Sequence, residues 1–281
     1  MRETINAVEI SLATAPGRPD RENEDFAAAT SRAFVVLDGV TPGPEDDGCR
    51  HGVPWFVNRL GLSLVAALSA TETAPALCLA AAIAEVAASH ADTCDLTRQT
   101  TPQATVAAGR IGRDSVEYLV LSDCSLVIDR SSTGDGIEVV TDDRVEHTAA
   151  HLRRRALALP EGSPEREAAR RRYAAEVGAL RNRPGGFWTA AADPEVAAEA
   201  LVGTIPRDGR GSVAAMTDGA ARFVDVLDIG DWPDLMKVLA DPGPEALIDQ
   251  IRAAELADPD RRRHRRGKIS DDATVLHIRS V

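Results

Sequence analysis

Four short acidic motifs carry the chemistry that this sequence is able to do. Each lies beside a short apolar run, and in chain order they are Glu24-Asp25, Asp38-Gly39, Asp218-Gly219 and Asp271-Asp272. Apolar runs of this length are typical of buried strands, so the acidic side chains are expected at the rim of a sheet. Carboxylates gathered in one place repel one another, and hard oxygen ligands favour Mg²⁺ or Mn²⁺. The pattern therefore predicts one carboxylate site that is held together by divalent metal.

Independent solvated turns are the alternative interpretation of these motifs, because Asp-Gly is also a common turn dipeptide. The order and strand context of all four motifs favour the shared site. They stand as Asn23-Glu24-Asp25, Leu37-Asp38-Gly39, Thr217-Asp218-Gly219 and Ser270-Asp271-Asp272-Ala273-Thr274-Val275. Over nearly the whole chain, this arrangement resembles the metal-dependent protein phosphatases of the 2C family.

The resemblance implies an α+β fold, in which a central antiparallel β-sandwich is flanked by helical pairs in α-β-β-α layers. The metal site would lie at one end of the sandwich, between the sheets. Because motifs near both ends of the chain share that site, residues 1–281 are expected to form a single phosphatase 2C-like domain. The charged stretch 146–183 would be a helical flap or insert within it.

The same resemblance gives each acidic residue a role. Asp38 would bridge two metal ions, and the Gly39 carbonyl and Glu24 would bind the second ion. Asp218 and Asp271 would bind the first ion. Two ions, Mn²⁺ or Mg²⁺, are therefore expected.

Further acidic residues would support these ligands. Asp25 and Asp272 would orient waters and ligands from behind. Asp123 lies in the stretch Ser122-Asp123-Cys124-Ser125, which looks like a family turn whose Asp assists a third metal. A second family Asp for that metal is replaced by Arg222, with Asp225 as a substitute, so a third site is doubtful.

The resemblance also implies a phosphate-binding arginine and a general acid, and for each the sequence leaves an alternative open. The family's phosphate-binding Arg position is occupied by Asp20, so Arg21 is preferred over Arg18, because a guanidinium suits phosphate geometry. Solvated surface charge is the other interpretation of Arg21. His51 is either a displaced acid that protonates the leaving oxygen or a polar residue that caps the following helix.

The expected reaction is hydrolysis of a phosphate monoester, because two close cations lower the pKa of a bridging water and offset the phosphate charge. Phosphoserine or phosphothreonine in a protein is the favoured substrate. A small phosphate ester and a catalytically weak, phosphatase-like binding protein are the alternatives. Cys124 and Arg130 have the spacing of cysteine-dependent phosphatases, but the interval between them is strand-like and lacks glycine, so this match is interpreted as chance.

Composition excludes several classes of partner. The 44 acidic and 32 basic residues give a net charge of −12, which disfavours nucleic acid. No uninterrupted apolar stretch of transmembrane length and no N-terminal signal region is evident, so no membrane partner and a cytoplasmic location are expected. The four cysteines show no paired spacing and are expected to be free thiols.

A basic run, Arg261 to Lys268, stands out in this acidic chain. Such a run is usually a solvated loop. Its position just before Asp271 also allows it to draw in an anionic substrate or an acidic partner.

Hydrophobic periodicity and turn residues predict the secondary structure. The expected strands are 7–12, 26–29, 33–37, 103–111, 116–121, 125–129, 137–140, 186–191, 201–205, 213–216 and 273–278. The expected helical segments are 52–70, 74–91, 146–182 with a break at 160–164, 194–200, 231–240 and 244–257.

Overall fold

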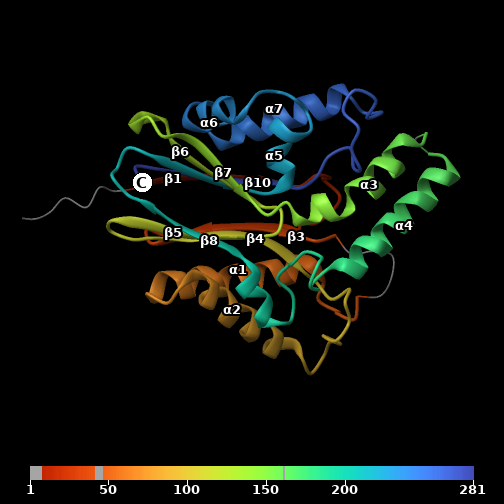
Figure 1. Ribbon diagram of the computed structural model, residues 1–281, viewed down its shortest axis with the longest axis horizontal. Coiled ribbons are helices and arrows are strands. Elements are labelled where there is room, and N and C mark those ends of the chain that lie inside the picture. Colours follow the sequence, from red (N-terminus) through yellow and green to blue (C-terminus); the bar gives the residue numbers. More distant parts are fainter. Residues whose placement is uncertain (1–7, 42–46, 161) are drawn as a thin grey trace, which may run out of the picture.

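The computed structural model describes residues 8–41, 47–160 and 162–281, and two antiparallel five-stranded sheets dominate it (Figure 1). The first sheet has the order β1 (Glu9–Ala15), β10 (Ala273–Arg279), β9 (Ser212–Met216), β6 (Ser125–Arg130), β7 (Gly136–Thr141). The second has the order β2 (Asp25–Ala29), β3 (Ala33–Gly39), β4 (Ala104–Ile111), β5 (Ser115–Leu121), β8 (Leu201–Pro206).

Helices cover the outer face of each sheet, as Figure 1 shows. The helices α1 (Gly52–Ala70) and α2 (Pro75–His90) pack on the second sheet. The helices α5 (Asp218–Asp225), α6 (Trp232–Ala240) and α7 (Pro244–Ala257) pack on the first. The predicted α-β-β-α sandwich is therefore confirmed. Two further helices, α3 (Arg144–Ala158) and α4 (Pro164–Leu180), project beside the layers, with short 3-10 helices at Ser131–Thr133 and Pro194–Glu199.

The continuous apolar run of β3 follows from burial on both faces. Successive side chains of a strand point to opposite faces of the sheet. Phe34 and Val36 join the apolar cluster between the two sheets, whereas Val35 and Leu37 join the cluster beneath α1 and α2. A strand with two buried faces carries no polar alternation, so the run indicates a strand in the middle of the layers.

Helix α1 is long and apolar enough to cross a membrane by length and composition alone, although Asn58 and Arg59 interrupt its apolar run. Its side chains explain the composition in another way. Leu60, Leu64 and Leu68 are fully buried in the cluster between α1, α2 and the second sheet. Core packing of this kind accounts for the hydrophobicity of the helix.

Strand register brings the acidic motifs to one end of the sandwich. Asp25 lies opposite Asp38 in the β2–β3 pair, and Met216, two residues before Asp218, lies opposite Val275 in the β9–β10 pair. Thr217 donates its backbone N–H to the Thr274 carbonyl, which extends that pairing toward the acidic residues. The acidic residues of the two sheets therefore lie at the same end of the sandwich.

Most expected elements are confirmed within a few residues at each end, but one expected strand is missing and one helix was not expected. The stretch 186–191 forms isolated bridges, Ala104 to Ala190 and Arg181 to Phe187, in place of a strand. Helix α5 was not expected, because it begins directly at Asp218 without a loop. The expected charged helical segment is observed as α3 and α4.

Candidate metal centre

The acidic side chains of the motifs lie close enough to raise one another's pKa. The pKa of Asp38 stands well above its usual range, first because of burial and then because of Asp218, Asp25 and Asp123. Asp218 is exposed on one side. Desolvation of its carboxyl group, followed by the charge of the nearby Asp271, nevertheless raises its pKa. Burial and like charges both disfavour the ionised form of a carboxyl.

The carboxyl groups of Asp38 and Asp218 are close neighbours, because the charge of Asp218 is the next cause, after burial, of the raised pKa of Asp38. Neighbouring carboxylates of this kind repel each other. A divalent cation held by both groups would offset their charges. The donor set therefore fits a hard metal ion such as Mg²⁺ or Mn²⁺.

Asp25 and Asp272 are held by neighbouring donors. Asp25 is 7% exposed and accepts a hydrogen bond of 3.0 Å from Thr217 Oγ1. Burial raises its pKa well above the usual range, and hydrogen bonds from Thr274 and Thr217 oppose that shift. The Asp272 carboxylate accepts the backbone N–H of Gly17 at 2.7 Å and of Glu24 at 2.6 Å. It therefore fixes the segment that carries Glu24.

The glycines of two motifs permit close backbone contact. Gly39 donates its N–H to the Glu24 carbonyl at 3.0 Å, and a Cβ on Gly39 would lie 2.3 Å from that oxygen. A Cβ on Gly219 would lie 1.8 Å from the Asp272 carbonyl oxygen. Any larger residue would push the paired motifs apart.

Asp271 lies between two cations. Arg222 donates to one carboxylate oxygen at 2.8 Å, and Lys268 donates to the other at 2.6 Å. Lys268 also donates to Thr41 at 3.0 Å, and the Thr41 hydroxyl donates to Glu24 at 2.6 Å. Arg222 thus places a positive charge where the family resemblance would supply an acidic residue for a third metal.

Asp123 lies in the turn between β5 and β6, where the chain crosses from one sheet to the other. Ser122 occupies the family's glycine position and has the left-handed φ of 67°. Burial, with a further contribution from Asp218, raises the pKa of Asp123 to about 6. Arg181, at the end of α4, opposes this shift. Sequence reasoning missed Arg181, which is separated from Asp123 by the whole of α3 and α4.

Of the two candidate phosphate-binding arginines, Arg18 is paired with Asp20 through two hydrogen bonds of 3.0 and 2.6 Å. Arg21 is exposed. Burial has the largest effect on Glu24 and raises its pKa, and the charge of Arg21 opposes that shift. Arg21 therefore lies within electrostatic reach of the centre.

His51 is the residue before α1, and its side chain makes no capping hydrogen bond. Its ring stacks on Trp55 at a centroid distance of 4.4 Å and contacts the thiols of Cys49 and Cys94. Within the described ranges, no hydrogen bond joins the His51 ring to an acidic residue of the centre. The general-acid role stays a prediction.

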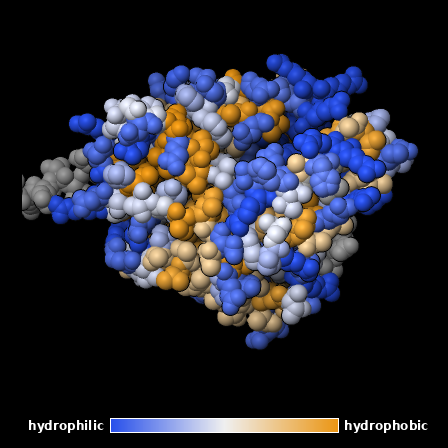
Figure 2. Space-filling model, viewed as in Figure 1, coloured by the Kyte–Doolittle hydropathy of each residue, from blue (hydrophilic) through white to orange (hydrophobic). Residues whose placement is uncertain are grey.

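The basic run has two parts. Arg266 is 1% exposed and donates to the Asp258 carboxylate at 2.8 Å and to four backbone carbonyl groups, so it holds the loop together. Arg262, Arg263 and Arg265 are exposed. Figure 2 shows a strongly hydrophilic surface at the upper right, where Figure 1 places the loop between α7 and β10.

Comparison with known proteins connects this fold to phosphatases. No protein-family model and no curated protein matches the chain. Among solved structures, it is similar to PppA, a regulatory component of T6SS in Pseudomonas aeruginosa, with 15% identity, 99% of each chain covered and a TM-score of 0.59. It is also similar to the catalytic domain of the serine/threonine protein phosphatase PstP in complex with two manganese ions, with 14% identity, 97% of this chain and 98% of that chain covered, and a TM-score of 0.57. Stp1, a serine/threonine phosphatase of Staphylococcus aureus, gives 14% identity, coverage of 98% and 95%, and a TM-score of 0.55. The fold is therefore that of the 2C-type serine/threonine phosphatases.

Asp38→Asn is expected to stabilise the metal-free protein. Above about pH 4 the unfolded chain ionises Asp38, whereas the folded protein retains the proton, so this residue destabilises the fold increasingly as pH rises. Asparagine removes that effect because its side chain carries no charge at any pH. Because about 1 kcal/mol moves the melting temperature by about 2–4 °C, thermal unfolding with chelator should show a gain of several degrees at about pH 8 and almost none at about pH 4. The exposed Asp249→Asn on α7 is the control, and equal gains in both variants at both pH values would contradict the charge cluster.

Gly219→Ala is expected to lower stability by about 1–3 kcal/mol, because the new methyl group meets the Asp272 carbonyl. Gly178→Ala in α4 is the matched control, since no atom lies within 4 Å of its Cβ position. Removing a helix-interior glycine should raise stability by about 0.5–1 kcal/mol. Denaturant unfolding measures both effects, and a neutral Gly219→Ala variant would show that the two motifs do not approach as described.

Proposed function

We propose that this protein is a metal-dependent phosphatase that hydrolyses phosphate monoesters, with phosphoserine and phosphothreonine in proteins as its substrates. The observation that carries the proposal is the carboxylate cluster around Asp38, in which burial and the charges of Asp218, Asp25, Asp123 and Asp271 raise the pKa of Asp38 at one end of a phosphatase-type sandwich. A protein that evolved only to bind would have no need to keep so many repelling charges together.

The proposed ligands are Asp38, Glu24 and the Gly39 carbonyl for one ion, and Asp38, Asp218 and Asp271 for the other. Manganese is supported by the two Mn²⁺ ions of the structurally similar PstP domain, and Mg²⁺ prefers the same oxygen ligands. When bound, such a pair of ions makes hydroxide available near neutral pH and offsets the charge of the phosphate.

The chain's own residues prepare this chemistry. Asp272 holds the backbone of Glu24 in place, and Thr217 and Thr274 hold Asp25 behind Asp38. Arg21 is the proposed phosphate-orienting residue, because it is exposed beside the centre and a guanidinium matches two phosphate oxygens.

A phosphorylated protein is the favoured substrate because the centre opens to the surface. Asp218 and Arg21 are both exposed, so a phosphate on a bulky partner can reach them. Beside α3, a surface depression of about 460 Å³ is lined by Arg144, His147, Trp188 and Glu199, among others. This depression offers room for a peptide chain. A phosphopeptide should therefore give a higher kcat/KM than a small ester, and the reverse order would favour the metabolite alternative.

Asp38→Asn and Asp218→Asn are each expected to lower Mn²⁺-dependent hydrolysis of a chromogenic phosphate ester by more than a hundredfold. Loss of a residue that only supports a metal ligand already costs about 10–100-fold, and these residues would be ligands themselves. Steady-state kinetics with and without chelator measure the effect, with Asp249→Asn as the control. Near-wild-type turnover in both variants would exclude the two-metal proposal, and absent wild-type turnover on all phosphate esters would favour the binding protein.

Cys124→Ser is expected to retain activity. Cys124 is fully buried beside Thr105 Oγ1, 3.0 Å away, and burial raises the pKa of its thiol well above the usual range. A neutral, buried thiol is not a nucleophile. The residues that follow it form β6 instead of a phosphate-binding loop. Turnover of the folded variant measures this, and its loss would point to cysteine chemistry.

A further inference from the structure

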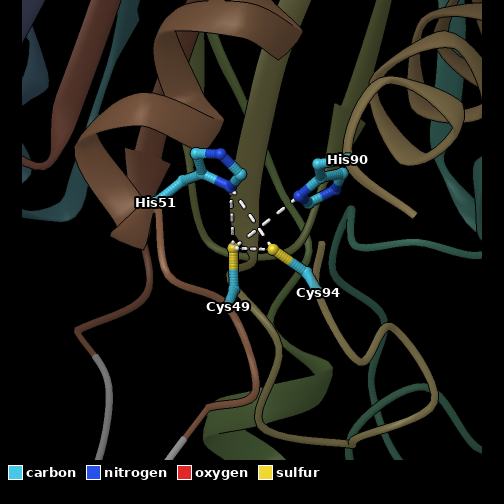
Figure 3. A group of neighbouring side chains, drawn as sticks. All are labelled: Cys49, His51, His90 and Cys94. Carbon is cyan, nitrogen blue, oxygen red and sulfur yellow. Dashed lines mark hydrogen bonds between the residues drawn. The ribbon is translucent and has the colours of Figure 1, made fainter. Parts of the chain in front are cut away.

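Two cysteines and two histidines converge outside the carboxylate centre. Cys49 and His51 lie just before α1, His90 is the last residue of α2, and Cys94 follows it. Figure 3 shows the four side chains pointing toward one another. The antiparallel packing of α1 and α2 places the start of one helix beside the end of the other, which brings residues about forty positions apart together.

We infer that Cys49, His51, His90 and Cys94 form a structural zinc site. Zinc takes cysteine sulfur and histidine nitrogen in tetrahedral sets of four. Each of the four residues offers one such atom, and these atoms all lie within 4.8 Å of one another.

Four of the six separations between ligand atoms match a tetrahedral site. Cys94 Sγ lies 3.3 Å from His51 Nδ1 and 3.4 Å from Cys49 Sγ. Cys49 Sγ lies 3.7 Å from Nδ1 of both His51 and His90. Zinc bonds of about 2.3 Å to sulfur and about 2.0 Å to nitrogen place the ligand atoms about 3.3–3.8 Å apart around the ion. Little movement is needed for binding.

Charge and burial suit zinc as well. Binding releases one proton from each thiol, and two thiolates with two neutral imidazoles balance the charge of Zn²⁺. Cys49 and His90 are buried, and the Trp55 ring lies against both histidines, at 4.4 Å from His51 and 4.9 Å from His90. Four protein ligands leave no open position, so the site would stabilise the fold instead of catalysing a reaction.

Zinc at this place would fix the start of α1 next to the carboxylate centre. Val53, two residues after His51, packs so closely on Gly39 that a Cβ there would lie 2.4 Å from it. A zinc-bound His51 is also not available as a general acid. The zinc site is independent of the proposed phosphatase activity, which rests on the carboxylates.

A disulfide between Cys49 and Cys94 is the alternative to zinc binding by the same two thiols. The two sulfur atoms lie 3.4 Å apart and both cysteines are free, whereas a disulfide requires about 2.05 Å. A bond between two cysteines would also leave the convergence of His51 and His90 unexplained.

Elemental analysis tests the site on full-length protein purified without added metal or chelator. About one zinc per chain is expected, as for other four-ligand structural sites. The Cys49→Ser/Cys94→Ser double variant should lose it, whereas Asp38→Asn/Asp218→Asn and the single variant Cys78→Ala should keep it. Loss of zinc in the Asp38→Asn/Asp218→Asn variant, or retention of zinc in the Cys49→Ser/Cys94→Ser variant, would overturn the inference.

A second measurement on the wild-type chain does not depend on the folding of variants. Cobalt added to zinc-free protein should give the intense visible absorption of a tetrahedral site with thiolate ligands, and zinc should abolish it and raise the melting temperature. Absorption typical of six oxygen ligands alone would overturn the zinc site. A Cys49–Cys94 disulfide found by mass spectrometry in protein isolated without air would overturn it too.

Discussion

Repulsion among carboxylates at one end of the sandwich is the constraint on which the rest of this structure depends. Each carboxylate is stabilised by a different group: Asp272 by backbone amides, Asp25 by threonine hydroxyls, and Asp271 by Arg222 and Lys268. At the centre, burial and like charges raise the pKa of both Asp38 and Asp218. Buried charge without compensation is costly. The surroundings thus stabilise the outer charges and leave the central pair as the place where a multivalent cation gains most.

The sequence predicted the parts of the fold that depend on local pattern. Apolar runs ending in Asp38 and Met216 were recognised as strands because their side chains are buried on both faces. The stretch 186–191 looked like a strand because of its apolar residues, but it makes only isolated bridges. Periodicity reports burial, and it does not report which backbone groups find partners.

Contacts between distant segments were the part that the sequence could not predict. Arg181 lies far along the chain from Asp123, and only the packing of α4 brings the two near. Spacing arguments treat cysteines in pairs along the chain, so Cys49 and Cys94 gave no signal. Their meeting depends on the antiparallel arrangement of α1 and α2, and this arrangement could have been used, since both helices were expected.

Strand β10 has a consequence for the order of events during synthesis. It is translated after every other described strand, yet it lies between β1 and β9 in the first sheet. A nascent chain that still has this segment inside the ribosome lacks a central strand, together with Asp271 and Asp272. Pairing of such distant segments is slow because a large loop must close first. The protein therefore cannot assemble the proposed metal centre, or any activity that would depend on it, before translation has passed β10.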